Sequence, residues 1–268
     1  MRHFSLWAMA LLACLLLSCE PQEESVNPED GISPGILDQL NALGFNTVDI
    51  EVKKIETGYI VEGDILLTQD QIMNMTPGSL LPTEEHYHTD NLVSGLPRTI
   101  SVFVDMPQLY RDATDIAIAR YNAENLNLTF QRVTSSSGAD MVLRASPFWY
   151  FWFGILGSAG FPTASGDPFN QILLTRQFYD NVSNINGLAT TIAHEIGHCI
   201  GFRHTDFMDR SFSCGGAPSN EGDGGVGANF IPGTPSGPDP GSWMLACGNP
   251  EGDRPFTAND QIALDFLY

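Results

Sequence analysis

The feature that most constrains this chain is a group of histidines around one glutamate. His194 and His198 are four residues apart. On an α-helix, residues at this spacing project from one face, about one turn from each other. Two imidazoles placed in this way can share one tetrahedral metal ion. Glu195 directly follows the first histidine, so it is placed to act on a water molecule bound to that metal.

A third ligand is expected just after this helix. Gly201 tolerates positive φ and lets the chain turn sharply, and three positions later the sequence has His204. The full spacing, H-E-x-x-H-x-x-G-x-x-H, is more specific than H-E-x-x-H alone. It predicts a metal site with three histidine ligands rather than a core helix that carries histidines by chance.

The 268 residues have the composition of an acidic globular protein. Hydrophobic residues make up 43% of the chain and charged residues 16%, which is enough apolar material for a substantial core. Acidic residues number 32 and basic residues 12, so the formal net charge is −20. This charge argues against nucleic acid or an anionic membrane surface as the main partner.

Residues 1–19 have the pattern of a targeting segment. Their apolar run is too short to span a bilayer comfortably. Leu16-Leu17-Ser18-Cys19 resembles a bacterial lipobox, which implies cleavage before Cys19 and lipidation of its thiol; the run that ends at Cys14 also fits, with a very short apolar core. The alternative is an ordinary secretory signal peptide. Either way we expect an exported protein, as a cell-envelope lipoprotein of the outer membrane or cell surface, or secreted, with membrane contact only through the lipid anchor.

Three cysteines remain once the targeting segment is set aside. In an oxidising compartment two of them are expected to pair. Cys214 and Cys247 bracket a long loop, whereas Cys199 lies among apolar residues of the histidine-bearing helix. We expect a Cys214–Cys247 disulfide with Cys199 as a buried free thiol, although the sequence alone does not determine the pairing.

The rest of the chain divides into three segments. Residues 20–35 are polar and rich in Glu, Pro and Ser, which predicts a disordered linker. Residues 36–96 form a small N-terminal unit, because hydrophobic periodicity predicts a helix, two strands and a second helix capped at Thr68. A loop around Pro82 separates this unit from a larger domain, residues 97–268.

The larger domain mixes strands and helices. Strand patterns occur at 99–104, 128–130, 141–143 and 171–175. Helical patterns occur at 109–123, from about residue 185 through the histidines, and after Thr257. Residues 209–241 are rich in Gly, Pro, Ser and Asp and are expected to be irregular. This order predicts an α+β fold.

These motifs resemble a known family. The motif His194-Glu195-x-x-His198-x-x-Gly201-x-x-His204, followed by Ser242-Trp243-Met244, resembles a metzincin zinc endopeptidase with its Met-turn. The residues His194-Glu195-Ile196-Gly197-His198 are similar to the naming motif of the bacterial dual-action HEIGH metallopeptidases. The resemblance covers residues 99–268. It implies a metzincin-like zincin domain with a twisted mixed sheet, an active-site helix, a Met-turn and a C-terminal helix, preceded by a small α+β prosegment-like unit.

The resemblance also implies roles for particular residues. Zn²⁺ would be bound by His194, His198 and His204, with water in the fourth position. Glu195 would be the general base that takes the proton of this water, and Met244 would form the floor of the site. The activity implied is hydrolysis of protein or peptide substrates by a monomer. Substrate would bind along an edge strand at Gln171–Thr175, preceded by Leu156–Gly160.

The sequence departs from related families in two places. Ala246 stands where astacins and serralysins have a zinc-binding tyrosine, so a tyrosine switch is not expected. The N-terminal unit has no cysteine of the kind that keeps matrixins latent. Instead Val61-Glu62-Gly63-Asp64-Ile65 is similar to the aspartate switch of astacin prosegments. Asp64 would then bind the zinc ion in a latent form and displace its water. The alternative is a solvated aspartate at the end of a strand.

Several features of the sequence have two interpretations. Asp206 and Asp209 either orient His204 or cap the loop after it. His86 and His88 either bind a second metal or are solvated, and the latter is favoured. The acidic loop 221–239 either binds Ca²⁺ or is simply flexible, and flexibility is favoured. The aromatic run 149–153 either packs in the core, which we expect, or lines a hydrophobic subsite.

Two other functions compete with peptide hydrolysis. One is an exported, non-catalytic binding module stabilised by zinc. Glu195 argues against it, because a structural zinc site needs no general base and usually closes its fourth position. The other is a hydrolase that acts on bonds other than peptides, since zinc and a glutamate serve those reactions as well.

Overall fold

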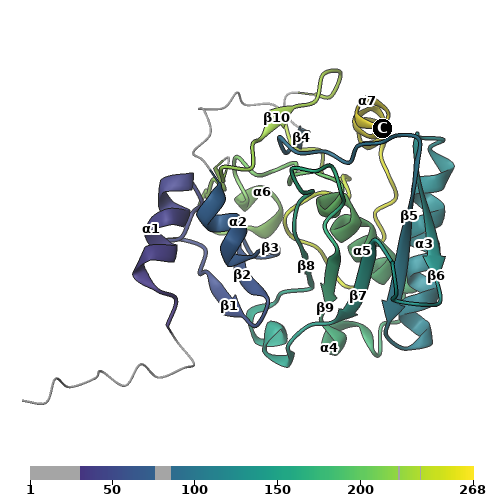
Figure 1. The fold of residues 1–268 in the computed structure, drawn as a ribbon, viewed down its shortest axis with the longest axis horizontal. Coiled ribbons are helices and arrows are strands. Elements are labelled where there is room, and N and C mark those ends of the chain that lie inside the picture. Colours follow the sequence, from purple (N-terminus) through teal and green to yellow (C-terminus); the bar gives the residue numbers. More distant parts are fainter. Residues whose placement is uncertain (1–30, 76–85, 223, 236) are drawn as a thin grey trace, which may run out of the picture. The chain divides into compact units, whose positions relative to one another are not determined.

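The computed structural model of the chain describes residues 31–75, 86–222, 224–235 and 237–268 (Figure 1). The predicted targeting segment, the lipidation site Cys19, most of the linker and the loop around Pro82 lie outside the described residues. Among the described helices, none is long and apolar enough to cross a membrane.

One mixed sheet of eight strands organises the described chain, in the order β1-β2-β3-β8-β9-β7-β5-β6 (Figure 1). Its parallel half is formed by β5 (Arg98–Asp105), β6 (Leu128–Val133), β7 (Met141–Ala145) and β9 (Gln171–Leu174). In β5 the side chains of Ile100, Val102 and Val104 are buried in alternation, as the sequence pattern predicts for a strand in a sheet.

The N-terminal strands continue the same sheet. β1 (Lys53–Ile55) and β2 (Gly58–Val61) form an antiparallel hairpin, and β2 pairs antiparallel with β3 (Ile65–Leu67). β3 runs parallel to β8 (Gly157–Ala159), with Ile65 opposite Ala159. Residues 32–268 accordingly form one compact unit. Whether residues 36–96 are a separate, removable unit stays a prediction.

The position of the predicted edge strand was wrong. β9 covers the predicted strand at 171–175, but it lies between β7 and β8 inside the sheet. The strand beyond it is β8, antiparallel to β9, and β8 is itself covered by β3. The short sequence Gly157-Ser158-Ala159 has no hydrophobic alternation, so nothing in its pattern indicates a strand.

Two long helices pack against each other and carry the main core. In α3 (Gln108–Ala123) the buried residues include Tyr110, Ala113, Ala117 and Tyr121, which recur at helical spacing. α5 (Ile185–Cys199) begins at Asn184, whose side chain accepts a hydrogen bond from the Asn186 N–H, and it is buried from residue 187 to its end. A hydroxyl hydrogen bond of 2.7 Å from Tyr121 to the Ala193 carbonyl joins the two helices.

The other helices close the ends of the structure. α1 (Pro34–Leu43) and α2 (Gln69–Asn74) pack with β2 and β3 in a second hydrophobic cluster, and α2 has the predicted capping box of Thr68 and Gln71. α7 (Ala258–Leu267) begins at the predicted cap Thr257. Short elements complete the fold: η1 (Phe148–Phe153), α4 (Arg176–Tyr179), α6 (Ser211–Cys214), and the strand pair β4 (Tyr87–His88) and β10 (Asn229–Phe230).

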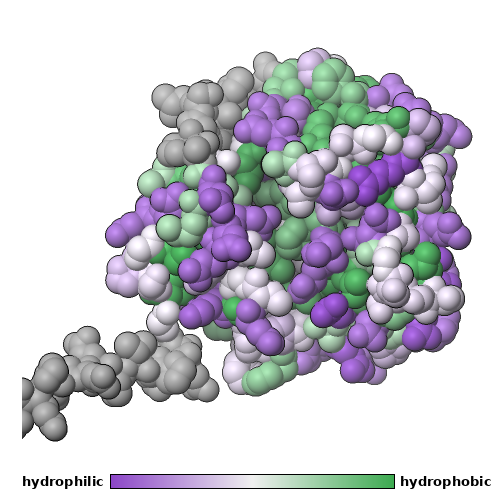
Figure 2. Space-filling view, in the orientation of Figure 1, coloured by the Kyte–Doolittle hydropathy of each residue, from purple (hydrophilic) through white to green (hydrophobic). Residues whose placement is uncertain are grey.

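The surface agrees with the acidic composition. In the orientation of Figure 2, hydrophilic residues cover much of the visible face, with hydrophobic residues scattered among them. The exposed large hydrophobic residues are concentrated in η1, where Phe148 and Trp152 are 61% and 70% exposed. The expected core packing of this aromatic run was therefore wrong for most of it. Tyr150 is buried and Trp149 packs against the core, but the other rings face outward because six consecutive residues in one short helix point in all directions.

Candidate metal centre and active site

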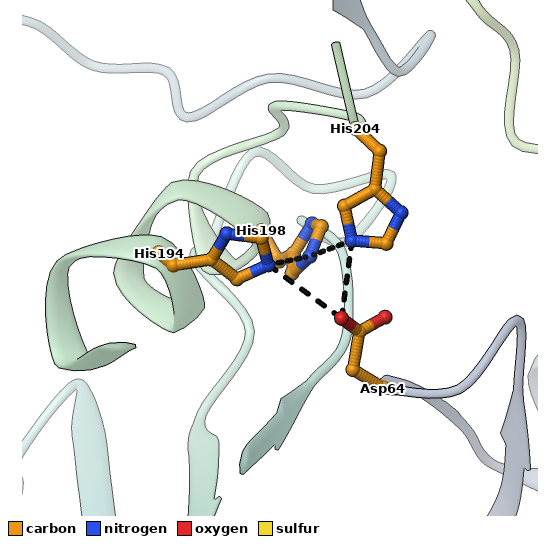
Figure 3. A group of neighbouring side chains, drawn as sticks. All are labelled: Asp64, His194, His198 and His204. Carbon is orange, nitrogen blue, oxygen red and sulfur yellow. Dashed lines mark hydrogen bonds and ion pairs between the residues drawn. The ribbon is translucent and has the colours of Figure 1, made fainter. Parts of the chain in front are cut away.

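Three imidazoles converge at the end of α5 (Figure 3). His194 and His198 project from the last turns of the helix, as the spacing predicts. Gly201 has φ of +108°, and this left-handed turn returns the chain so that His204 faces the other two rings. The Nε2 atom of His198 lies 3.0 Å from Nε2 of His194 and 3.2 Å from Nε2 of His204.

The opposite ring nitrogens show which tautomer each histidine adopts. Nδ1 of His194 lies 2.8 Å from the Trp243 carbonyl, and Nδ1 of His198 lies 2.9 Å from the Phe202 carbonyl. A carbonyl only accepts hydrogen bonds, so these Nδ1 atoms carry the proton and donate it. Nδ1 of His204 lies 2.7 Å from the Glu221 carboxylate, which accepts in the same way. Each Nε2 then presents a lone pair to the other rings.

Three lone pairs that face one another need a cation. Unprotonated nitrogens cannot hydrogen-bond to each other, and separations of 3.0 and 3.2 Å leave no room for a water molecule between them. A tetrahedral ion with nitrogen ligands at 2.0–2.1 Å has its ligands about 3.3 Å apart, close to the separations found here. The geometry of the three histidines therefore fits a tetrahedral metal ion.

Asp64 completes the group. Its Oδ2 atom lies 3.1 Å from Nε2 of His204 and 3.6 Å from Nε2 of His194, and all four candidate ligand atoms lie within 4.8 Å of one another (Figure 3). Burial acts to raise the pKa of Asp64, but the neighbouring imidazoles of His204 and His194 hold it well below its usual range. Among the described residues this is the one group of three or more such side chains close enough to hold a metal ion.

Glu195 lies beside the metal group without joining it. It is 2% exposed, and its Oε2 atom has no hydrogen-bond partner among the described residues. Burial, reinforced by the charge of Asp64, raises the pKa of Glu195 well above its ordinary value. A buried carboxylate with an unused oxygen and a raised pKa is suited to accept and return a proton at neutral pH.

The predicted Met-turn residues lie beneath the histidines. Met244 is fully buried, and its sulfur packs so closely under Gly197 of α5 that a Cβ at Gly197 would come within 2.5 Å of it. The Met244 carbonyl accepts a hydrogen bond from the Thr205 N–H, directly after the third histidine. Ala246, two residues on, donates its N–H to Asp206. Met244 therefore contacts the site through packing.

Glu221, rather than the predicted aspartates, is the acidic residue that holds His204. Asp206 accepts hydrogen bonds from Ala246 and Ser213, and Asp209 accepts them from Ser211. Both aspartates thus stabilise the loop, and the hydrogen bonds described for them do not involve His204. The sequence did not reveal Glu221, because it lies 17 residues after His204 in a loop whose composition predicts irregular structure.

Glu221 belongs to a buried network of charges. Arg210 bonds to Glu221 through Nη1, and Arg203 lies 3.7 Å from it. Burial acts to raise the pKa of Glu221, but His204 and Arg210 lower it to about 2, so the carboxylate stays ionised. Glu62, from the N-terminal strands, lies 3.2 Å from Arg203, and its carbonyl accepts a hydrogen bond from Arg210.

The remaining sequence candidates lie elsewhere. Cys214 and Cys247 form a disulfide that ties α6 to the segment after Met244, and Cys199 is free and buried. His86 is neither a ligand of a described metal group nor solvated: it is buried, with Nε2 2.8 Å from an oxygen of Asp260. The described acidic residues of the loop 221–239 form no group that fits a cation.

A cavity of about 190 Å³ adjoins the metal group. Its walls include His194 and Glu195 of α5, residues 153–157 leading into β8, and residues 245–248 after Met244. A molecule bound at the histidines therefore has a neighbouring space that can take a side chain.

Comparison with known proteins places the chain in a family. No curated protein sequence matches it. Two solved structures of myroilysin are similar: one has 14% sequence identity and a TM-score of 0.42 over 66% of this chain and 82% of that chain. The other has 12% identity and a TM-score of 0.39 over 64% of this chain and 83% of that chain. The family model described as dual-action HEIGH metallo-peptidase matches residues 59–268, a range that contains Asp64, the three histidines and Glu195, and the chain therefore belongs to this family of metallopeptidases.

Proposed function

We propose that this metallopeptidase is a zinc-dependent endopeptidase on a metzincin scaffold. The observation that supports it best is the pairing of two features: three converging Nε2 lone pairs, and Glu195 beside them with an unpartnered oxygen. A site that only stabilised a fold would not need the second feature, because a buried carboxylate without a hydrogen-bond partner is costly. The nitrogen ligands and the tetrahedral spacing favour zinc.

The residues divide the chemistry between them. His194, His198 and His204 would hold the ion, and the acceptor at each Nδ1 would fix the orientation of the ring. Zinc, when bound, supplies Lewis-acid chemistry that lowers the pKa of a water molecule and polarises a carbonyl. Glu195 would accept a proton from the attacking water and pass it to the leaving amine. Its raised pKa makes it a stronger base, which favours the first of these transfers.

We further propose that the described arrangement is a latent form of the enzyme. Asp64 lies close enough to the three histidines to take the position that a bound tetrahedral ion would otherwise leave open for water. The strand that begins directly after Asp64, β3, covers β8, along which an extended substrate would otherwise add to the sheet. The Ala159 N–H donates to the Asp64 carbonyl at 3.1 Å, so the covering strand and the proposed switch are the same segment.

Export and lipidation of Cys19 also remain proposals, as do the monomeric state and a protein or peptide substrate. The Cys214–Cys247 disulfide supports export, because structural disulfides persist in oxidising compartments. The net charge of −20 supports a soluble catalytic region that does not bind anionic membranes, leaving the anchor as the point of attachment.

Substitution of the general base separates catalysis from metal binding. Glu195→Ala should retain zinc, because Glu195 is not among the ligand atoms, and should lower casein turnover by at least about 100-fold. Zinc content by atomic absorption and casein turnover with and without a chelator are the measurements. Near-normal turnover by this variant would remove Glu195 from the mechanism, whereas loss of zinc would make it a structural residue.

Removal of the proposed switch should affect the onset of activity. Asp64→Ala vacates the fourth position, so freshly purified chain should cleave casein without the lag or processing that the wild type needs. Asp70→Ala is the matched control, since it removes an acid from α2 in the same N-terminal segment but away from the histidines. Identical time courses for wild type and Asp64→Ala would contradict the switch.

Weakening the acceptor behind the third histidine should weaken metal binding. Glu221→Gln replaces a charged acceptor at His204 by a neutral one, and we expect zinc affinity to fall by about 10- to 100-fold. Competition with a chromogenic chelator measures the affinity. Glu251→Gln, a change of the same chemistry at an exposed residue distant in the chain, should leave it unchanged. Equal zinc affinities in all three proteins would show that Glu221 only neutralises Arg203 and Arg210 and does not support metal binding.

The anchor is tested by labelling. Cells that express the chain should incorporate radiolabelled palmitate into it, and Cys19→Ser should abolish both the label and its recovery with membranes. Label that persists in Cys19→Ser would disprove lipidation at Cys19, and an unlabelled wild type would favour the secretory alternative.

A further inference from the structure

One arginine borders the cavity beside the metal group and is held there from two sides. The Arg254 N–H donates to the Thr190 hydroxyl of α5 at 2.9 Å, and its Nη1 donates to the Cys247 carbonyl at 3.1 Å. Cys247 is itself fixed by its disulfide to Cys214. Arg254 is half-buried. Its guanidinium is therefore positioned in advance, so little conformational entropy is lost when a ligand binds to it.

Among the described residues, no carboxylate lies within ion-pair distance of Arg254. This distinguishes it from the other half-buried and buried arginines, all of which form ion pairs: Arg98, Arg120, Arg132, Arg203 and Arg210. Asp206 is the acid whose charge reaches Arg254, but both of its oxygens are occupied by donors from Ala246 and Ser213. Although the protein is acidic, the guanidinium of Arg254 is thus fixed at the wall of a cavity without a carboxylate partner among the described residues.

The other basic residue at this cavity has its partners already. Arg210 contacts Glu221 and donates to the Glu62 carbonyl at 2.5 Å. Among the described residues, the carboxylates that line the cavity are Asp64 and Glu195, and both belong to the metal centre. The Arg254 side chain has five N–H groups and makes one hydrogen bond to the described part of the chain, so donors remain for an incoming acceptor.

We propose that Arg254 is the specificity-determining residue of the peptidase and that the cavity takes an acidic side chain, Asp or Glu, of a residue flanking the scissile bond. The inference rests on the proposed endopeptidase function and names its substrate class. A carboxylate matches the guanidinium in charge and accepts two parallel N–H groups from it. The neutral isostere, Gln or Asn, keeps the shape but loses the charge, so the site discriminates between them.

The experiment uses the full chain with zinc, and casein turnover measures peptidase activity as such. Cleavage sites in casein are mapped by mass spectrometry for wild type, Arg254→Gln and the control Arg132→Gln, which removes the same charge from an ion pair on β6. Peptides based on the main site are then compared as Glu and Gln pairs at each of the two flanking positions, and kcat/KM is measured for each.

The wild type and Arg132→Gln should favour Asp or Glu at one flanking position, with kcat/KM for the Glu peptide at least about tenfold above that for its Gln partner. In Arg254→Gln this ratio should fall to about one. Should that variant not fold, Arg254→Lys keeps the charge but loses the paired donors, and the ratio should drop several-fold. A ratio of one in the wild type, or a ratio unchanged in the folded Arg254 variant, overturns the inference alone. Absence of casein turnover by both the processed wild type and Asp64→Ala overturns the proposed function instead.

Discussion

The site depends on the hydrogen bonds at the far side of each histidine. Each Nδ1 donates to a different acceptor: the Trp243 carbonyl, the Phe202 carbonyl and the Glu221 carboxylate. These bonds fix the tautomers and aim the three Nε2 lone pairs at one point. The segment around Met244, the turn after α5 and the loop at residue 221 are therefore all parts of the metal centre, although none of them contributes a ligand atom.

The buried carboxylate of Glu221 requires positive charges beside it, and the arginines that supply them also contact the N-terminal strands. Glu221 is fully buried, and Arg203 and Arg210 lie on it. The same two arginines also bind Glu62, two residues before Asp64. The segment that carries Asp64 is thus bound by the same two arginines that neutralise Glu221, the hydrogen-bond acceptor of His204. A buried pair that loses one partner is strongly destabilised, so departure of this segment requires the arginines to find water or new acceptors.

The sequence predicted the parts of the site that depend on local spacing. The helix that carries His194 and His198, the turn at Gly201 and the position of His204 follow from helical periodicity and the conformational freedom of glycine. The periodic core of α3 and the caps at Thr68 and Thr257 were predicted for the same reason. All of these are relations between residues a few positions apart.

What the sequence did not predict depends on contacts between distant segments. Glu221 lies in a loop whose composition indicates only irregularity, and its role appears only once the loop folds back on His204. β8 is three small residues long and becomes a strand through its neighbours on both sides. His86 looked like a surface histidine, yet it pairs with Asp260, which is 174 residues away in the chain. Spacing motifs carry no information about such pairings.

The cavity beside the metal centre connects the proposed latency with the proposed substrate specificity. Gly63 and Asp64 line the same cavity as Arg254, so the proposed inhibitory segment borders both the metal centre and the space assigned to a substrate side chain. Asp64 contacts the histidines rather than Arg254, so among the described residues the guanidinium has no carboxylate partner although Asp64 lines the same cavity. An acidic substrate would then meet, in one place, an edge strand that accepts extended chain and a fixed positive charge. The edge of β8 is paired with β3 in the described structure, so it would become accessible only when β3 leaves. On the proposed latency, release of the N-terminal strand would therefore precede pairing of a substrate with β8.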